Sequence, residues 1–368
     1  MNFFMPTQLI SGHGAVLSCE ERIASFGKKC LLVTSGTAAT RSGALKDVTE
    51  ILNRNGIAYQ IYDRILPNPT VASCIDAGQI GTSFGAEFVI GIGGGSPLDA
   101  AKVVAVSIAN PSATEATLYA QRWVNPPVPV ILVGTTAGTG SEVTPTAVLT
   151  NGERRKASIT GPALFAALSI GDPRYTETMS LKGSASTGMD ALCHCVESFL
   201  SKTATPVFRG AAVEGIRMLV PQLERIAPGI IPSPEEREIL YDGSILGGLA
   251  ICVTGTLAPH SFGYFLTEQY DIPHGFACAF FLPVLLEHVS SVDPALCAAL
   301  EERTGIFIGR LLALTDSILP DCRLELQDEQ IAALLPRWDP SNKNLRKTPG
   351  CFDAAVTERF LRSVFHPI

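Results

Sequence analysis

The sequence lacks several features that assign a chain to a large class of proteins. It has no long run of basic residues and a net charge of −7, which argues against nucleic acid as its main partner. Its ten cysteines are scattered without a C-x-x-C pair, so we expect buried thiols in a reducing cytoplasm and no disulfide framework. The longest apolar stretch, residues 276–286, is too short to span a bilayer. The start, residues 1–6, lacks the charged and apolar regions of a signal peptide.

The pattern along the 368 residues changes once, so we expect two domains. Up to about residue 170, short apolar runs alternate with helical stretches, which predicts a parallel sheet with covering helices. From about Ser180 onward the pattern is helical, and the tail from Pro320 to Ile368 is irregular. The predicted domains are residues 1–172 and 173–368. The predicted strands are residues 30–34, 59–62, 88–92 and 128–133, and the prolines expected to interrupt the tail are Pro320, Pro336, Pro340 and Pro349.

Three of the six histidines and one aspartate form a candidate metal site in the helical half. Asp190 and His194 are four residues apart in a stretch of helical pattern, which places both side chains on one face of a helix. His260 and His274 follow, each in a short window that contains a proline and a glycine. One carboxylate with three imidazoles suits a divalent first-row metal such as Fe, Zn, Co, Ni or Mn. For each histidine alone, the alternative is a buried side chain satisfied by hydrogen bonds.

The spacing between His260 and His274 predicts a turn in the chain. A continuous helix would separate their Cα atoms by about 21 Å, at about 1.5 Å per residue, and two ligands of one ion must lie much closer. Gly263 and residues 271–273, which include Pro273, are the positions able to break a helix there.

A glycine-rich loop in the first half is a candidate phosphate-binding site. The predicted strand ending at Ile92 runs into Gly93-Gly94-Gly95-Ser96-Pro97-Leu98-Asp99. We expect Ser96 as the N-cap, Pro97 at the first helical position and Asp99 in a capping box. A strand, a glycine turn and a helix start direct N–H groups and a helix dipole at an anion. The alternative is a tight turn that binds no ligand, because the loop is not the G-x-G-x-x-G fingerprint.

A second loop has the same character. The predicted strand ending at Val133 continues into residues 134–145, which mix glycines with Thr135, Thr136, Thr139 and Ser141. Ligands of open parallel sheets bind beyond the carboxyl ends of the strands, where both loops are expected.

With these two loops, the helix of residues 188–194 and the two histidine windows, the chain resembles the group III, iron-containing alcohol dehydrogenases. The resemblance extends from Pro6 to Pro283. It implies a Rossmann-like, dinucleotide-binding α/β domain and an all-α metal-binding catalytic domain. It further implies hydride transfer between NAD or NADP and a small alcohol or aldehyde whose oxygen a divalent metal polarises. Fe(II) is the expected metal and Zn(II) the alternative.

The resemblance assigns the metal to Asp190, His194, His260 and His274, with no catalytic residue beyond these ligands. Asp99 and Lys102 match the same family loop, and the alternative for Asp99 is a helix cap. Lys156 matches a lysine near the ribose, and the alternative is a solvated charge run. The residues expected to face the cofactor are Ser35, Gly94, Gly95, Ser96, Asp99, Thr135, Thr136, Thr139 and Lys156.

Two departures from the family pattern affect the substrate pocket and the cofactor. Thr256 stands where many members have a second histidine. Ser35 stands where many NAD-using members have an aspartate that binds the ribose 2′-hydroxyl, and Arg41 follows nearby. Because an acid would repel a 2′-phosphate and serine would not, the choice between NAD and NADP stays open.

Other functions on the same residues remain alternatives. They are a cyclising lyase resembling dehydroquinate synthase, a metal-dependent hydrolase, and a non-catalytic nucleotide-binding relative. We also expect a homodimer or larger homo-oligomer in the cytoplasm, and no nucleic-acid or membrane partner. The residues expected to line the substrate pocket are Thr146, Ile251 and Phe262.

Overall fold

The computed structural model describes residues 3–321, 324–339 and 341–366. The chain forms two compact units, Asn2–Met179 and Ser180–Ile368, called here the N-terminal and the C-terminal unit. The division falls later than Asp172, the predicted end of the first domain. Residues just beyond Asp172 still pack on the N-terminal unit, where the Tyr175 hydroxyl donates a hydrogen bond to the Asp47 carboxylate at 2.8 Å.

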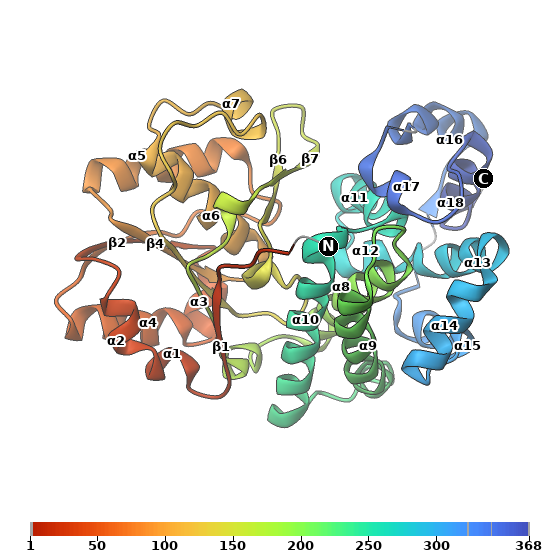
Figure 1. Ribbon diagram of the computed structural model, residues 1–368, viewed down its shortest axis with the longest axis horizontal. Helices are drawn as coiled ribbons and strands as arrows, with labels where there is room; N and C mark the ends of the chain where they lie inside the picture. The colour runs from red at the N-terminus through yellow and green to blue at the C-terminus, as the bar shows by residue number, and fades with distance from the viewer. Residues whose placement is uncertain (1–2, 322–323, 340, 367–368) are drawn as a thin grey trace. The chain divides into compact units, whose positions relative to one another are not determined.

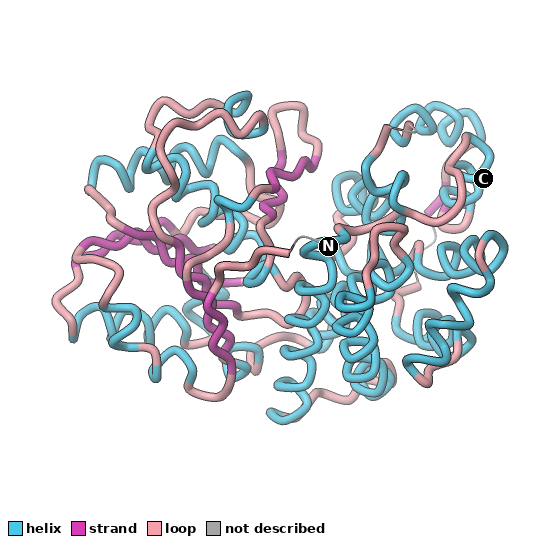
Figure 2. Tube along the Cα trace, viewed as in Figure 1, coloured by secondary structure: helices cyan, strands magenta, loops and turns pink. Residues whose placement is uncertain are grey.

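The N-terminal unit is built on one six-stranded sheet whose strand pairs are all parallel (Figures 1 and 2). The strand order is β1-β8-β5-β4-β2-β3, so the chain crosses over between strands that are neighbours in space. The predicted strands are confirmed as β2, β3, β4 and β5. The strands of the sheet are β1 (Gln8–Ser11), β2 (Lys29–Thr34), β3 (Ala58–Tyr62), β4 (Phe88–Gly93), β5 (Val130–Gly134) and β8 (Leu168–Gly171).

Helices cover both faces of this sheet, which explains the continuous apolar runs of its inner strands. Alternate residues of β2 belong to different apolar clusters. Leu31 and Val33 pack with residues of α5 and α6, whereas Cys30 and Leu32 pack with residues of α1 to α4. The helices are α1 (Ala15–Ser18), α2 (Glu20–Ala24), α3 (Thr37–Arg41), α4 (Ala44–Arg54), α5 (Val71–Phe84), α6 (Gly95–Ala109) and α7 (Glu115–Tyr119).

Four strands of this unit have no counterpart among the predicted strands. β1 and β8 have four residues each, which is too short for a periodic pattern to stand out. β6 (Thr146–Thr150) and β7 (Lys156–Thr160) form an antiparallel hairpin that follows the second glycine-containing loop. The remaining elements of the unit are the 3-10 helices η1 (Ser141–Val143), η2 (Pro162–Leu164) and η3 (Pro173–Thr176).

The C-terminal unit is helical, as predicted, apart from two strands of two residues each in its tail. Its central helix, α8, is buried along most of its length and packs against α9, α10 and α12. The elements are α8 (Leu181–Leu200), α9 (Pro206–Ile226), α10 (Pro234–Thr254), α11 (Ala258–Tyr270), α12 (His274–Ala279), α13 (Leu282–Val292), α14 (Pro294–Thr304), α15 (Ile308–Ile318), β9 (Leu324–Glu325), α16 (Asp328–Leu334), η4 (Leu335–Trp338), α17 (Lys343–Lys347), α18 (Ala354–Arg362) and β10 (Phe365–His366).

The irregular tail packs on α11, the helix that carries His260. The Thr348 hydroxyl accepts a hydrogen bond from the Ala258 amide at the start of α11, and the Trp338 indole donates to the Ser261 carbonyl. Side-chain and backbone contacts therefore hold the first turns of α11 from outside. Pro340, one of the prolines expected to interrupt the tail, lies outside the described residues, as do residues 1–2 of the start.

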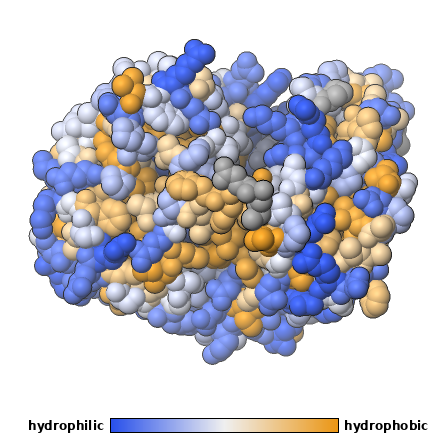
Figure 3. All heavy atoms as spheres, viewed as in Figure 1, coloured by the Kyte–Doolittle hydropathy of each residue, from blue (hydrophilic) through white to orange (hydrophobic). Residues whose placement is uncertain are grey.

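The stretch His274–Val292 is longer than the apolar run of residues 276–286 and passes a length and composition test for crossing a membrane. Since 67% of its apolar window is buried inside the protein, it matches the core helix of a folded unit. On the face seen in Figure 3, apolar residues lie among polar ones. The most exposed large apolar side chains come from separate connecting loops: Leu66, Val124, Ile231 and Phe307.

Candidate functional site

Helix α8 presents Asp190 and His194 on one face, as their spacing predicts. Asp190 Oδ1 lies 3.7 Å from His194 Nε2, and both side chains are almost fully buried. Ser180 caps the start of the helix by accepting a hydrogen bond from the Gly183 amide. The continuous helix beyond this cap fixes the two side chains one turn apart.

The chain breaks between His260 and His274, as predicted. Helix α11 ends at Tyr270, Asp271 follows with a left-handed φ of 53°, and α12 begins at His274 after Pro273. Gly263, the other expected break, lies inside α11. It is the close approach of α12 that requires glycine there, since a Cβ on Gly263 would stand 2.9 Å from the Cys278 amide nitrogen.

A second glycine brings α12 against α8. A Cβ on Gly275 would stand 1.7 Å from the Ser186 carbonyl oxygen, so no other residue fits without moving a helix. With α12 held there, His274 Nε2 lies 3.8 Å and His260 Nε2 lies 3.3 Å from Asp190 Oδ1. The rings of His194 and His260 stack with centroids 4.7 Å apart. The structure thus brings all four predicted ligands together.

Two atoms at the centre of this cluster are buried without a hydrogen-bond partner among the described residues. They are Asp190 Oδ1 and His260 Nε2, on side chains that are only 4% and 2% exposed. A buried unpaired carboxylate oxygen is costly, so such atoms indicate a group that satisfies them. Burial raises the pKa of Asp190, but the nearby charges of His194 and His274 outweigh it and hold that pKa below its usual range.

Glu197 is a site residue that the sequence reading missed. Its carboxylate is fully buried, and Oε1 lies 2.5 Å from His260 Nδ1 while Oε2 accepts from the Leu257 amide at 2.5 Å. Because an ionised carboxylate only accepts, His260 carries its proton on Nδ1 and directs the lone pair of Nε2 at Asp190. The signal was available: Glu197 is three residues after His194 on the same helix, hence on the same face.

Cys278 is a second residue that the sequence reading missed. The ligand atoms of Asp190, His260, His274 and Cys278 all lie within 4.8 Å of one another. Cys278 follows His274 by one helical turn, and this spacing was the available signal. The oxygen, nitrogen and sulfur donors suit a divalent first-row metal, so the residues present fit the metal that the sequence predicts.

The first glycine loop starts its helix earlier than predicted. Gly93 has a φ of 149°, and α6 begins at Gly95 with Gly94 as its N-cap. Ser96 is therefore not the N-cap, and Pro97 lies in the first turn but not at its first position. The error arose because serine is the stronger cap former, while the backbone turn at Gly93 sets the start. Among the described residues no side chain caps α6.

The two glycine loops meet at this helix start. A Cβ on Gly94 would stand 3.1 Å from Thr136 Cγ2, and one on Gly95 would stand 2.7 Å from Thr139 Cγ2. The predicted cofactor residues Gly94, Gly95, Ser96, Thr136 and Thr139 are half-buried. Thr135 is only 3% exposed, and its hydroxyl has no hydrogen-bond partner among the described residues.

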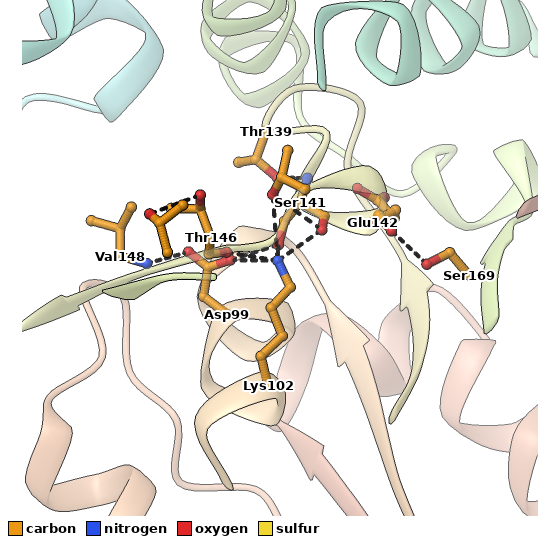
Figure 4. Close-up of polar contacts among 10 residues, drawn as sticks. Asp99, Lys102, Thr139, Ser141, Glu142, Thr146, Val148 and Ser169 are labelled. Carbon is orange, nitrogen blue, oxygen red and sulfur yellow. Dashed lines mark hydrogen bonds and ion pairs between the residues drawn. The ribbon is translucent and has the colours of Figure 1, made fainter. Parts of the chain in front are cut away.

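Asp99 does not cap its helix, and its carboxylate is engaged within the protein. Its carboxylate accepts from the Ser141 hydroxyl at 2.6 Å and the Val148 amide at 2.8 Å, and it pairs with Lys102 Nζ at 3.5 Å (Figure 4). Lys102 is fully buried, and its Nζ also donates to the Thr146 carbonyl at 2.7 Å. We call these residues the Asp99–Lys102 clamp. It ties α6 to the loop and hairpin of residues 141–148.

The remaining predicted residues lie apart from these clusters or are engaged elsewhere. Ser35 follows β2 and is half-buried, while the Arg41 guanidinium donates to the Thr178 carbonyl at 3.3 Å. Lys156 begins β7 and is half-buried. Thr256, which replaces a family histidine, accepts from the Asn344 amide at 3.1 Å.

Phe262 does not line a pocket as predicted. It is fully buried and stacks on Trp338 and Phe360, with centroids 4.7 and 5.3 Å away. The tail packs over the face of α11 that carries Phe262, and the sequence pattern of the tail is too irregular to show this. Thr146 and Ile251 are half-buried.

Comparison with known proteins gives consistent matches. Residues 6–173 match the family described as iron-containing alcohol dehydrogenase, and residues 184–314 match the C-terminal Fe-containing alcohol dehydrogenase family. The 1,3-propanediol dehydrogenase of Klebsiella pneumoniae is 33% identical over 311 residues, 83% of this chain and 79% of that protein. A crystal structure of an iron-containing alcohol dehydrogenase matches with a TM-score of 0.91 and 32% identity, covering 99% of this chain and 98% of the other. The sulfoacetaldehyde reductase of Bifidobacterium kashiwanohense, solved with NAD+, matches with a TM-score of 0.88 and 25% identity over 99% and 98% of the two chains.

Proposed function

Because this chain belongs to the iron-containing alcohol dehydrogenase family, we propose that Asp190, His194, His260 and His274 hold its metal. The chain is a metal-dependent alcohol dehydrogenase or aldehyde reductase that uses NAD and iron. When bound, the iron would act as a Lewis acid on the substrate oxygen, and the nicotinamide ring would supply or accept the hydride. The proposal extends to small alcohols and aldehydes as substrates.

One observation carries the ligand assignment. Asp190 Oδ1 and His260 Nε2 are buried 3.3 Å apart, and neither has a hydrogen-bond partner among the described residues. If these side chains served only for packing, both polar atoms would lose their contact with water and gain no hydrogen bond in exchange, which destabilises the fold. A divalent cation between them satisfies both, and the two further imidazoles complete its ligand set.

The protein's own residues prepare this site. Glu197 holds the proton of His260 on Nδ1, so that Nε2 is an acceptor before any metal arrives. The side chain of His274 is 29% exposed, whereas those of Asp190 and His260 are 4% and 2% exposed. The centre therefore opens to solvent on the side of His274, where substrate oxygen approaches.

For the cofactor, we propose that the start of α6 binds the pyrophosphate. Its first N–H groups lack a side-chain cap among the described residues, and the helix dipole favours an anion there. Gly94 and Gly95 let the backbone approach closely. The predicted contacts beyond this helix start are Ser35, Ser96, Thr135, Thr136, Thr139 and Lys156; Asp99 contributes through the clamp and not as a direct ligand.

The lyase and the hydrolase are not favoured, because the relatives are dehydrogenases and reductases. A cytoplasmic location, a homodimer or larger homo-oligomer, and the absence of nucleic-acid and membrane partners are parts of the proposal. The net charge of −7 supports the absence of nucleic acid. Light scattering after gel filtration measures the oligomeric state.

The test of the proposed function is a reductase assay on protein reconstituted with Fe(II) or with Zn(II). Small aldehydes are supplied with NADH, and the loss of NADH absorbance is followed. We expect turnover that depends on the added metal, and none after chelation. Loss of NADH that does not depend on the aldehyde, or full activity without metal, would overturn the proposal.

Selection between NADH and NADPH is proposed to depend on Ser35. Asp63 lies beside the next residue, Gly36, since a Cβ on Gly36 would stand 4.0 Å from Asp63 Cβ. The Arg41 guanidinium already donates a hydrogen bond to the Thr178 carbonyl. We therefore expect NADH to be favoured with measurable use of NADPH. Ser35→Asp is expected to lower kcat/KM for NADPH about 10-fold and to leave NADH within about 2-fold. Equal losses with both cofactors would remove residue 35 as the selector.

A further inference from the structure

The sulfur of Cys278 belongs to the same group of ligand atoms as three of the proposed metal ligands. Cys278 Sγ lies 3.7 Å from Nδ1 and 3.7 Å from Nε2 of His274. It also lies within 4.8 Å of the ligand atoms of Asp190 and His260, and the residue is fully buried. An i, i+4 pair on α12 thus directs a thiol and an imidazole at one point.

The packing of α12 keeps the sulfur there. A Cβ on Gly263 would stand 2.9 Å from Cys278 Sγ, so the glycine at this position of α11 leaves room for the sulfur. On the other side, Gly275 lies against the Ser186 carbonyl of α8. The backbone carrying Cys278 is fixed between two helices that themselves carry proposed ligands.

A buried cysteine usually acts as a small apolar side chain. Cys193 and Cys195 flank His194 in the sequence, yet neither belongs to the group of close ligand atoms found among the described residues. Cys278 differs because it faces two buried polar atoms, Asp190 Oδ1 and His260 Nε2, that have no hydrogen-bond partner in the described part of the chain. These atoms point to an ion that the sulfur would also reach.

We propose that Cys278 supplies a further, thiolate ligand to the metal held by Asp190, His194, His260 and His274. This inference rests on the proposed function, because it requires the metal site. On metal binding the S–H bond breaks, the proton passes to solvent and the sulfur lone pair forms the bond to the ion. A soft sulfur donor among nitrogen and oxygen ligands favours Zn(II) and Co(II) relative to harder ions such as Mn(II).

The test uses Co(II) alone as the probe, added to metal-free protein and followed by absorption spectroscopy. We expect visible d–d bands that report a bound ion, and a near-ultraviolet thiolate-to-cobalt charge-transfer band. Cys278→Ser is expected to retain the d–d bands and lose the charge-transfer band. The matched control is Cys297→Ser on α14, since Cys297 is buried and its sulfur accepts a hydrogen bond from Ser290; it keeps both.

X-ray absorption on the Zn(II)-loaded wild-type protein provides a second measurement that needs no variant. A thiolate ligand gives a sulfur scatterer at about 2.3 Å. Wild-type spectra with d–d bands but neither the charge-transfer band nor the sulfur scatterer would overturn the Cys278 proposal and leave the metal site standing. Wild-type protein that binds neither ion would overturn both.

Preference among metals gives a further readout. The ratio of the Kd for Mn(II) to the Kd for Zn(II) is expected to fall at least about 10-fold in Cys278→Ser relative to wild type, since the softest donor is lost. An unchanged ratio would contradict a sulfur bond to the ion.

Discussion

Charged side chains are buried both in the C-terminal unit and in the N-terminal unit. In the C-terminal unit they belong to the proposed ligands Asp190, His194, His260 and His274, called here the metal cluster. In the N-terminal unit they form the Asp99–Lys102 clamp, and the two groups differ in their hydrogen bonding. Lys102 Nζ contacts the Ser141 hydroxyl, the Thr146 carbonyl and Asp99, and Asp99 in turn accepts from Ser141 and Val148. In the metal cluster, Asp190 Oδ1 and His260 Nε2 have no such partners among the described residues. Buried polar groups that satisfy one another hold a fold together, whereas unsatisfied ones mark a place for a ligand.

The largest effect is expected where the unsatisfied cluster loses a ligand. His274→Ala should lose bound iron, and its kcat/KM should fall more than about 100-fold, beyond what loss of a residue behind a ligand costs. The chain should stay folded because this side chain is 29% exposed. Metal analysis, steady-state kinetics and circular dichroism measure the three quantities. If His274→Ala kept full metal and full activity, His274 would not be a ligand.

Breaking the satisfied clamp should affect stability and not metal content. Lys102→Met keeps most of the side-chain volume but leaves Asp99 without its cation. Removal of one partner of a buried pair costs about 3–5 kcal/mol, and we expect about 3 kcal/mol because Asp99 is 14% exposed and keeps two other donors. Urea unfolding monitored in the N-terminal unit measures the loss.

The control for the clamp is the double variant Asp99→Asn with Lys102→Met, which removes both charges. It should regain part of the stability lost in the single variant. An unfolding midpoint of Lys102→Met equal to that of wild type would show that the clamp does not stabilise the unit.

An intermediate effect is expected at Glu197, whose carboxylate has hydrogen-bond partners and holds the His260 imidazole. Glu197→Gln keeps the shape but removes the charge behind His260, so the imidazole becomes a weaker donor to the metal. The Kd for Fe(II) or Zn(II), measured by competition with a chelator, should rise about 10- to 100-fold. The control is Glu268→Gln on α11, the helix that carries His260. It removes a carboxylate that pairs with Arg337, and it should leave that Kd unchanged. An equal rise in both variants would mean that the loss is general and not specific to His260.

The smallest effect concerns His288, a buried histidine of the C-terminal unit that is satisfied. Its Nδ1 accepts from Arg359 at 2.7 Å, so its Nε2–H donates to the Pro349 carbonyl at 2.9 Å. Burial lowers the pKa of His288 from its usual value; the hydrogen bond to the Pro349 carbonyl opposes this shift, and the charges of Arg359 and Lys202 add to it. Below about pH 6.5 the unfolded chain therefore binds the proton first, and the free energy of unfolding falls as pH falls.

The measurement is the free energy of unfolding of the C-terminal unit between pH 7 and pH 5, in wild type and in His288→Gln. The variant should show a flatter dependence on pH and unchanged metal content. A slope identical in the two proteins would show that another group titrates.

The four proposed ligands were accessible from the sequence because their recognition depends on local spacing. Asp190 and His194 are one helical turn apart, and the distance between His260 and His274 required a break that the structure has at residues 271–273. The prediction that Ser96 and Asp99 cap the helix was wrong. It rested on the preference of serine for N-cap positions, whereas in the structure the chain turns at Gly93, which has a positive φ, and the helix starts at Gly95. Phe262 was misplaced because the tail that covers it has no periodic pattern.

The sequence by itself determined which residue types carry the chemistry, and which of them lie on one strand or one helical turn. That follows because helix and strand periodicities act over a few residues. Only the tertiary structure decided which buried polar groups satisfy one another. Asp99 and Lys102 formed a structural clamp with the loop and hairpin of residues 141–148. Glu197 and Cys278 came beside the proposed metal ligands through helices that approach one another at Gly263 and Gly275. Close approach of that kind depends on atoms far apart in the chain, so no local pattern of residues encodes it.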